Sequence, residues 1–249
     1  GAGLALAPLA DELGITVKVF GTPAEEGGGG KIIMLEAGAF AGVHAAMMVH
    51  PAPTELDSFP CLAVSHVDVH YHGKSAHASG FPELGINAAD AITVAQTAIG
   101  LLRQHIRHTD RIHGIVTHGG DAPNIVPHET AGKWYIRSRN LRELEDLEPK
   151  VHRCFEAGAL ATGCSYDIVE QSPKYSEMNV DAELTALYRA NAEGLGRAFA
   201  DLGADAHRLA GSTDMANGSL TIPTIHPLLG LGCFPVSHHQ PDSAPVGVG

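Results

Sequence analysis

Residues 15–30 read ITVKVFGTPAEEGGGG, an apolar strand pattern that runs directly into two adjacent glutamates and a run of four glycines. Neighbouring side chains at the end of a strand point in different directions. One carboxylate, Glu25 or Glu26, can therefore bind a metal ion while the other acts on a water molecule beside it. Glycines would let the backbone approach a bound ion closely. The alternative interpretation is a pair of solvated carboxylates on a loop.

Helix and strand patterns alternate on both sides of this stretch. Helical patterns cover residues 2–13, 31–37 and 182–202, and strand patterns cover 45–49 and part of 220–231. Short apolar strands between helices predict a parallel sheet covered on both faces. Ligands of such open sheets bind at the carboxyl ends of the strands, which favours the metal-site interpretation of the glutamate pair.

The pattern changes between residues 61 and 172. Strand patterns cover 62–72, 111–118, 129–138 and 165–170, and helical patterns cover 84–106 and 141–161. This order, β-α-β-β-α-β, is typical of a ferredoxin-like unit. The sequence therefore predicts an α/β fold in which residues 1–60 and 173–249 form one domain and residues 61–172 form an inserted domain.

Several histidines are candidates for the metal site. His50 follows the strand pattern 45–49 and should lie at the same sheet edge as Glu26. His238 or His239, in a proline-flanked loop, could complete a site with these two residues. Neutral imidazole is a good zinc ligand. The alternative for His50 is a strand-end histidine that is bonded to the backbone.

Further candidates follow from local sequence. His77, in a loop of the insert, is either an ordinary loop histidine or a hydrogen-bond donor to an oxyanion. Arg137 ends an apolar strand and could present its guanidinium to a substrate carboxylate. Gly211 and Ser212 precede Asp214 in a segment suited either to backbone N–H groups that face an anion or to a helix cap.

Composition excludes some functions. The net charge of −12 over 249 residues argues against nucleic acid as a partner. The chain has no apolar run of about 18 residues or more, so no membrane-spanning segment is predicted. Its four cysteines show no close metal-type pairing, which favours free thiols in a reducing, cytoplasmic compartment.

Short motifs in a fixed order resemble metallopeptidase family M20, the aminoacylase and carboxypeptidase type. Within it, the similarity is to the amidohydrolase branch that acts on aminobenzoyl-glutamate and β-alanyl dipeptides. The motifs are GTPAEE (21–26), VHP (49–51), YHGKSAHAS (71–79), GINAADA (85–91), PNIVP (123–127) and GSTD (211–214).

The resemblance implies a zinc-peptidase-like catalytic domain with an inserted ferredoxin-like lid and dimerisation domain. It implies that Glu25 is the general base and that Glu26, His50 and His238 are metal ligands, with His239 as the alternative to His238. It also implies that His77 reaches across a homodimer to polarise the scissile carbonyl. The positions of Asn124 and Arg137 resemble substrate contacts of the family.

The implied activity is hydrolysis of the amide bond of an N-acyl amino acid or small dipeptide by metal-activated water. The resemblance implies two divalent ions per active site, zinc or else manganese or cobalt. The family takes further ligands from an upstream Cys-Gly-His type motif that this sequence does not contain. We therefore expect an N-terminally truncated fragment that is inactive by itself. The alternative is a metal-depleted, non-catalytic homologue that binds small molecules.

Overall fold

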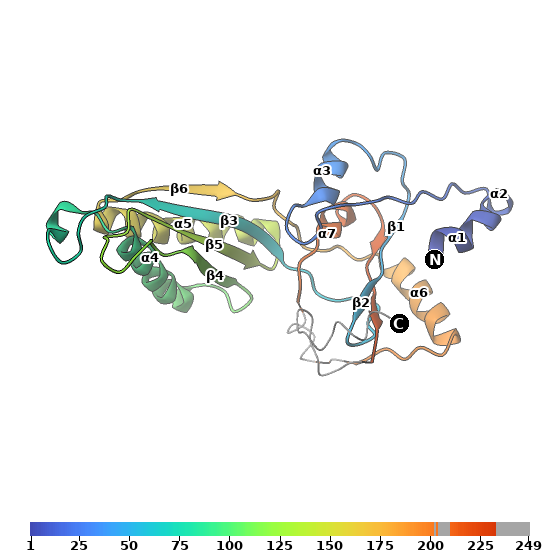
Figure 1. Cartoon of the computed structure of the whole chain (residues 1–249). Helices are drawn as coiled ribbons and strands as arrows, with labels where there is room; N and C mark the ends of the chain where they lie inside the picture. Colours follow the sequence, from blue (N-terminus) through green and yellow to red (C-terminus); the bar gives the residue numbers. More distant parts are fainter. Residues whose placement is uncertain (202, 204–209, 233–249) are drawn as a thin grey trace.

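Alternating apolar residues build a four-stranded antiparallel sheet in the middle of the chain (Figure 1). The computed structural model describes residues 1–201, 203 and 210–232. The strand order is β4-β5-β3-β6, and each neighbouring pair is antiparallel. The strands are β3 (Ala63–His72), β4 (Arg111–His118), β5 (Glu129–Ser138) and β6 (Ser165–Glu170). This arrangement confirms the predicted β-α-β-β-α-β order.

Two capped helices cover one face of this sheet. They are α4 (Ala88–Leu102) and α5 (Leu141–Thr162). The side chain of Asn87 accepts a hydrogen bond from the Ala89 N–H, and Asn140 caps α5 in the same way. The cap explains why α4 begins later than the predicted residue 84. Short 3-10 turns flank α4 on both sides, namely η2 (Pro82–Leu84) and η3 (Arg103–His105).

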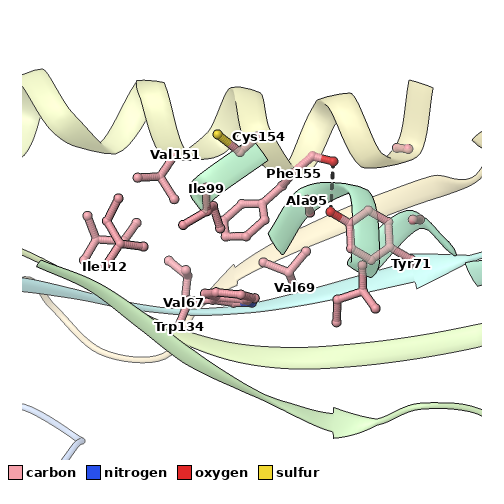
Figure 2. Packing of buried hydrophobic residues seen from close by; sticks show 14 of the residues in the cluster. Val67, Val69, Tyr71, Ala95, Ile99, Ile112, Trp134, Val151, Cys154 and Phe155 are labelled. Carbon is pink, nitrogen blue, oxygen red and sulfur yellow. Dashed lines mark hydrogen bonds between the residues drawn. The ribbon is translucent and has the colours of Figure 1, made fainter. Parts of the chain in front are cut away.

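The core lies between the sheet and these helices (Figure 2). Val67, Val69 and Tyr71 alternate along β3 and point at the helices in Figure 2, and they share a cluster with Trp134 of β5 and Phe155 of α5. Tyr71 is fully buried, and its hydroxyl donates a hydrogen bond to the Phe155 carbonyl at 2.9 Å. The opposite sheet face therefore carries the alternate residues of each strand, which are mostly polar.

Gly158 permits the close approach of α5 to α4. A Cβ atom at this position would lie 2.3 Å from the backbone oxygen of Ala91. We expect Gly158→Ala to lower the free energy of unfolding by about 1–3 kcal/mol, because the helices must move apart. Gly100→Ala, at a site in α4 with open space around it, is the matched control. It should raise stability by about 0.5–1 kcal/mol. Denaturant unfolding of both variants measures the difference, and equal effects would contradict the packing explanation.

The remaining segments form two short parallel pairs. β1 (Ala46–Met47) pairs with β7 (Thr224–Ile225), and β2 (His50–Ala52) pairs with β8 (Leu228–Gly230). A parallel sheet covered on both faces was predicted for these parts of the chain, and the described residues instead form two separate two-stranded parallel pairs. The helices around these pairs are α1 (Ala2–Leu6), η1 (Ala7–Leu9), α2 (Ala10–Leu13), α3 (Gly30–Glu36), α6 (Ala182–Gly194) and α7 (Met215–Ser219).

Three predicted elements need correction. Residues 15–20 form no strand: Ile15 and Val19 are 46% and 81% exposed, and within the described residues this segment pairs with no other strand. The predicted helix 2–13 is interrupted at η1, where Pro8 cannot supply a helical N–H donor. The predicted helix 182–202 ends at Gly194, and Gly196 adopts the left-handed backbone conformation that terminates helices.

Candidate active site

The glutamate pair lies in a tight turn that leads into α3. Ala24, just before the pair, has a φ of 60°, which is unfavourable for a residue with a side chain. The turn is closed by a hydrogen bond from the Gly28 N–H to the Ala24 carbonyl at 3.0 Å. A Cβ atom at Gly30 would lie 1.9 Å from the Pro23 carbonyl oxygen, so this position requires glycine. Glu25 is half-buried in this turn and Glu26 is exposed.

Tyr175 binds the turn from the side. Its hydroxyl accepts a hydrogen bond from the Gly29 N–H at 3.0 Å and donates one to the Glu25 carbonyl at 2.9 Å. Burial raises the pKa of Tyr175 to about 12, so the phenol keeps its proton at neutral pH. No local pattern in the sequence marks this residue, because its hydroxyl binds backbone groups that are distant along the chain.

A buried ion pair holds the first turn of α3. The Lys31 ammonium lies 2.7 Å from one carboxylate oxygen of Asp214, and the other oxygen accepts a hydrogen bond from the Lys31 N–H at 3.0 Å. The Asp214 side chain is fully buried. Asp214 occupies the N-cap position of α7, but its side chain makes no capping bond to that helix. Thr213 makes the local contact instead, by accepting a hydrogen bond from the Met215 N–H.

His50 and His226 lie next to each other at the ends of short strands. Their ring centroids are 6.0 Å apart. His50 Nδ1 lies 2.7 Å from the Pro51 carbonyl, which can only accept, so Nδ1 carries a proton. Burial lowers the pKa of His226 to about 4, which keeps this imidazole neutral. His226 was missed, although both histidines follow a short apolar strand and precede a proline.

The candidate ligands are of the types that bind a divalent cation, but the described residues supply too few of them. Carboxylate oxygen from Glu26 and neutral imidazole from His50 are ligands that zinc accepts. Both ring nitrogens of the buried His226 lack a hydrogen-bond partner within the described residues. Across residues 1–201, 203 and 210–232, however, no group of three or more potential ligands is placed to hold a metal. The predicted third ligand, His238 or His239, lies outside the described residues.

Arg137 lies on the open face of the four-stranded sheet and reaches the segment around Ser212. Its Nη1 donates to the Ser212 hydroxyl at 2.7 Å, and Ser212 in turn donates to the Leu62 carbonyl at 2.7 Å. The Arg137 Nε lies 3.2 Å from His113 Nε2. The guanidinium forms no ion pair with a described residue. Partial burial lowers the pKa of Arg137. Arg137 therefore presents a half-buried positive charge.

Gly211 does not present its N–H to a ligand. This group donates to the Pro60 carbonyl at 3.1 Å, and the Gly211 carbonyl accepts from the Leu62 N–H at 2.8 Å. The segment 211–214 is thus used for structure, by Gly211 and Asp214, and the prediction of anion-facing amides at Gly211 is wrong.

His77 and Asn124 lie together on neighbouring loops of the insert. The Ala78 N–H donates to the Asn124 carbonyl at 2.9 Å, and His77 pairs with Ile125. His77 Nδ1 accepts from the Gly80 N–H at 3.0 Å, so the Nε2 atom carries the proton and can donate. Both residues are exposed. These loops follow the far ends of β3 and β4, away from the glutamate turn of the same chain (Figure 1).

His66 lies on the same sheet face as Arg137, in register with Tyr135, and is buried. Its ring packs edge-on against Tyr135 and Tyr175, with centroids 4.2 and 5.0 Å away. Ser172 donates its hydroxyl proton to the Pro173 carbonyl, so His66 Nδ1 is the donor to Ser172, at 2.8 Å. Burial, reinforced by the charges of Arg137 and His113, lowers the pKa of His66 to about 4.

The stability of the chain should therefore depend on pH through His66. Its folded-state pKa, about 4, lies below the unfolded value near 6.5, so the unfolded chain binds more protons in this range. The contribution of His66 to the free energy of unfolding is fully present above pH 6.5 and is lost as the pH falls towards 4. The loss is about 3 kcal/mol at most. Denaturant unfolding between pH 7 and pH 4 should show a smaller decrease for His66→Gln than for the unaltered chain. Parallel curves for the two proteins would contradict the assignment.

Comparison with known proteins supports one family. The profile of the peptidase dimerisation domain of M20 enzymes matches residues 64–162. The chain is 39% identical to the Xaa-Arg dipeptidase of Mus musculus, over 91% of this chain and 52% of that protein. It therefore spans about half the length of this relative.

Solved structures share the fold. One is the aminobenzoyl-glutamate utilization protein from Klebsiella pneumoniae, with a TM-score of 0.69 and 22% identity over 92% of this chain and 61% of that one. Another is a dinuclear metal-binding peptidase of the M20 family from Bacillus subtilis, with a TM-score of 0.56 and 19% identity. The second alignment covers 88% of this chain and 56% of the other. Residues 64–162 thus belong to the peptidase dimerisation domain of M20 enzymes, and the chain shares its α/β fold with solved M20 peptidases.

Proposed function

We propose that the whole protein is a metal-dependent amide hydrolase that cleaves an N-acyl amino acid or a small dipeptide. The observation that carries the proposal is the glutamate turn, which Tyr175 binds at the Glu25 carbonyl and which leads into a helix held by the Lys31–Asp214 pair. The identity to a protein named as a dipeptidase supports the substrate class. Because the chain spans only part of that relative, each functional test uses the whole protein.

In the proposed reaction, Glu25 is the general base. It takes a proton from the attacking water and later delivers it to the leaving amine. Glu26 and His50 would hold the cation together with His238 or His239. Zinc is the expected ion, with manganese or cobalt as alternatives, and two ions per active site are expected. When bound, the ion supplies a Lewis acid that makes water more acidic and polarises the amide carbonyl.

The inserted unit supplies the rest of the site. Arg137, next to Ser212, binds the substrate carboxylate through its charged guanidinium. Asn124 contacts the substrate from the loop that it shares with Ile125. His77 donates its Nε2–H to the oxyanion that develops on the scissile carbonyl. Since His77 lies far from the glutamate turn of its own chain, we propose that it acts in the active site of a partner subunit, in a homodimer formed through residues 61–172.

The dimer arrangement gives a specific expectation for mixed variants. His77→Ala and Glu25→Gln should each abolish most activity when alone. In a 1:1 mixture of refolded subunits, half the dimers are mixed, and each has one intact site. About one quarter of the unaltered activity should therefore return. A mixture that stays inactive, while both variants are shown to be dimers, would place His77 in the active site of its own subunit.

The proposal includes a domain division and a compartment. Residues 1–60 and 173–249 would form the catalytic domain, and residues 61–172 the lid. Cys61, Cys154 and Cys164 are free, and burial raises the pKa of the Cys61 thiol to about 12. Such unreactive thiols fit the expected reducing cytoplasm. No helix in the described part of the chain is long and apolar enough to cross a bilayer.

The second candidate is a non-catalytic binding homologue, favoured by the incomplete ligand set of the described residues. Metal analysis of the whole purified protein separates the two. Two equivalents of bound metal, with turnover of a panel of N-acyl amino acids, aminobenzoyl-glutamate and dipeptides, support the hydrolase. A metal-free protein that binds these compounds without hydrolysing them supports the alternative.

A further inference from the structure

Tyr175 stands where three segments of the chain meet. Its backbone pairs with Val64 at the start of β3, through the Tyr175 N–H at 3.1 Å and the Val64 N–H at 3.0 Å. Its ring packs against Ile32 of α3 and against Val64. Its hydroxyl reaches the glutamate turn. Tyr175 thus connects β3, a strand of the inserted sheet, to the backbone of Glu25.

The Tyr175 hydroxyl satisfies two backbone groups that lie on opposite sides of the turn. It has one proton, which it donates to the Glu25 carbonyl, and its lone pair accepts the Gly29 N–H. Gly29 is the N-cap residue of α3, with a φ of 63°, and it has no side chain that could cap the helix. A Cβ atom there would lie 3.2 Å from the Tyr175 ring. Removal of the hydroxyl alone would therefore leave a buried donor and an acceptor unpaired at the two ends of the Glu25-containing turn.

The turn needs such a restraint, because its own backbone is unfavourable. Ala24 has a positive φ immediately before Glu25. Conformations of this kind persist where the surroundings fix them, and they recur at functional sites. Glu25 itself is half-buried, so the direction of its carboxylate follows from the path of the backbone at this residue.

We propose that Tyr175 is a positioning residue, whose hydroxyl fixes the turn at Glu25 and thereby aims the Glu25 carboxylate at the reacting water. The inference rests on the proposed function of Glu25 and adds to it a residue distant in sequence. Tyr175 touches neither substrate nor metal in this role, and acts only through the backbone of the turn.

The test compares Tyr175→Phe with Tyr71→Phe in the whole protein. Both tyrosines are buried and donate to a backbone carbonyl at 2.9 Å, but Tyr71 does so inside the core of the insert. In Tyr175→Phe, the Gly29 amide should exchange with deuterium about 10-fold faster or more. Its kcat on a dipeptide that ends in arginine should fall about 10- to 100-fold, with KM within about twofold. Tyr71→Phe should change neither quantity, even at an equal loss of stability.

Unchanged Gly29 exchange in Tyr175→Phe, or equal kcat losses in both variants, would overturn the inference. The unaltered protein supplies a measurement that needs no folded variant. There, the Gly29 amide should be protected to a degree comparable with the Val69 amide of β3, and unprotected exchange would also overturn it. Turnover of Glu25→Gln, measured beside these variants, tests the proposed function separately, because amide exchange does not depend on Glu25 being the base.

Discussion

Replacement of Glu25 by glutamine in the whole protein should lower kcat by about 10²–10⁴-fold while the metal content stays unchanged. Glutamine keeps the size and hydrogen-bonding capacity of the side chain but cannot accept a proton from water. The turn that holds it depends on backbone contacts with Tyr175, so the fold of this region should persist. Steady-state turnover and elemental analysis of the same sample measure both quantities.

Two variants make this expectation specific. Glu26→Gln removes a proposed ligand, so it should reduce metal content and activity together. Glu36→Gln changes an exposed glutamate at the end of α3 and should alter neither. If Glu25→Gln retained full turnover, Glu25 would not be the base. If it lost its metal as Glu26→Gln does, the roles of the two neighbours would have to be exchanged.

Asp214→Asn should lower the free energy of unfolding by about 3–5 kcal/mol. The substitution leaves the Lys31 ammonium buried without its counter-charge, since its side chain is only 8% exposed. The asparagine oxygen can still accept the Lys31 N–H, so the loss comes mainly from the unpaired charge. Denaturant unfolding of the chain, followed by circular dichroism, gives the magnitude.

A double-mutant cycle separates charge from geometry at this pair. Lys31→Met should also be strongly destabilising, because the fully buried Asp214 carboxylate loses its cation. Lys31→Met combined with Asp214→Asn removes both charges, and its loss should fall short of the sum of the single losses by about 2 kcal/mol or more. Additive losses would show that the two side chains do not interact as the 2.7 Å contact implies.

The inserted sheet was predictable because its information is local. β4, β5 and β6 begin and end where the alternating pattern predicted. Asparagine caps mark the starts of α4 and α5, and a glycine marks the end of α5. Residues 15–20 carry an equally good strand pattern and form none. A strand is defined by a hydrogen-bonded neighbour as much as by its own residues, and within the described residues no neighbour pairs with this segment.

The candidate site divides in the same way. Glu25, Glu26 and His50 stand out because glycine and proline mark the turns around them. Lys31 and Tyr175 do not, because their partners are 183 and 146 positions away and no local pattern encodes such contacts. At Gly211 the local sequence suggested a function that the structure does not show. The backbone of Gly211 makes hydrogen bonds to Pro60 and Leu62 instead of facing an anion.

The two short parallel pairs have a kinetic consequence. Ala46 pairs with Thr224, and His50 with Leu228, so these ladders close around the entire inserted unit. Bringing such distant residues together carries a loop-closure entropy that grows with the length of the intervening flexible chain. The pairings inside the insert, such as Val67 with Glu170, join residues that are closer in the sequence than Ala46 and Thr224 are. The insert should therefore collapse first, which makes that part of the chain compact and brings its two ends close together. Refolding should therefore be sequential, with β3 to β6 preceding the pairing of the chain ends.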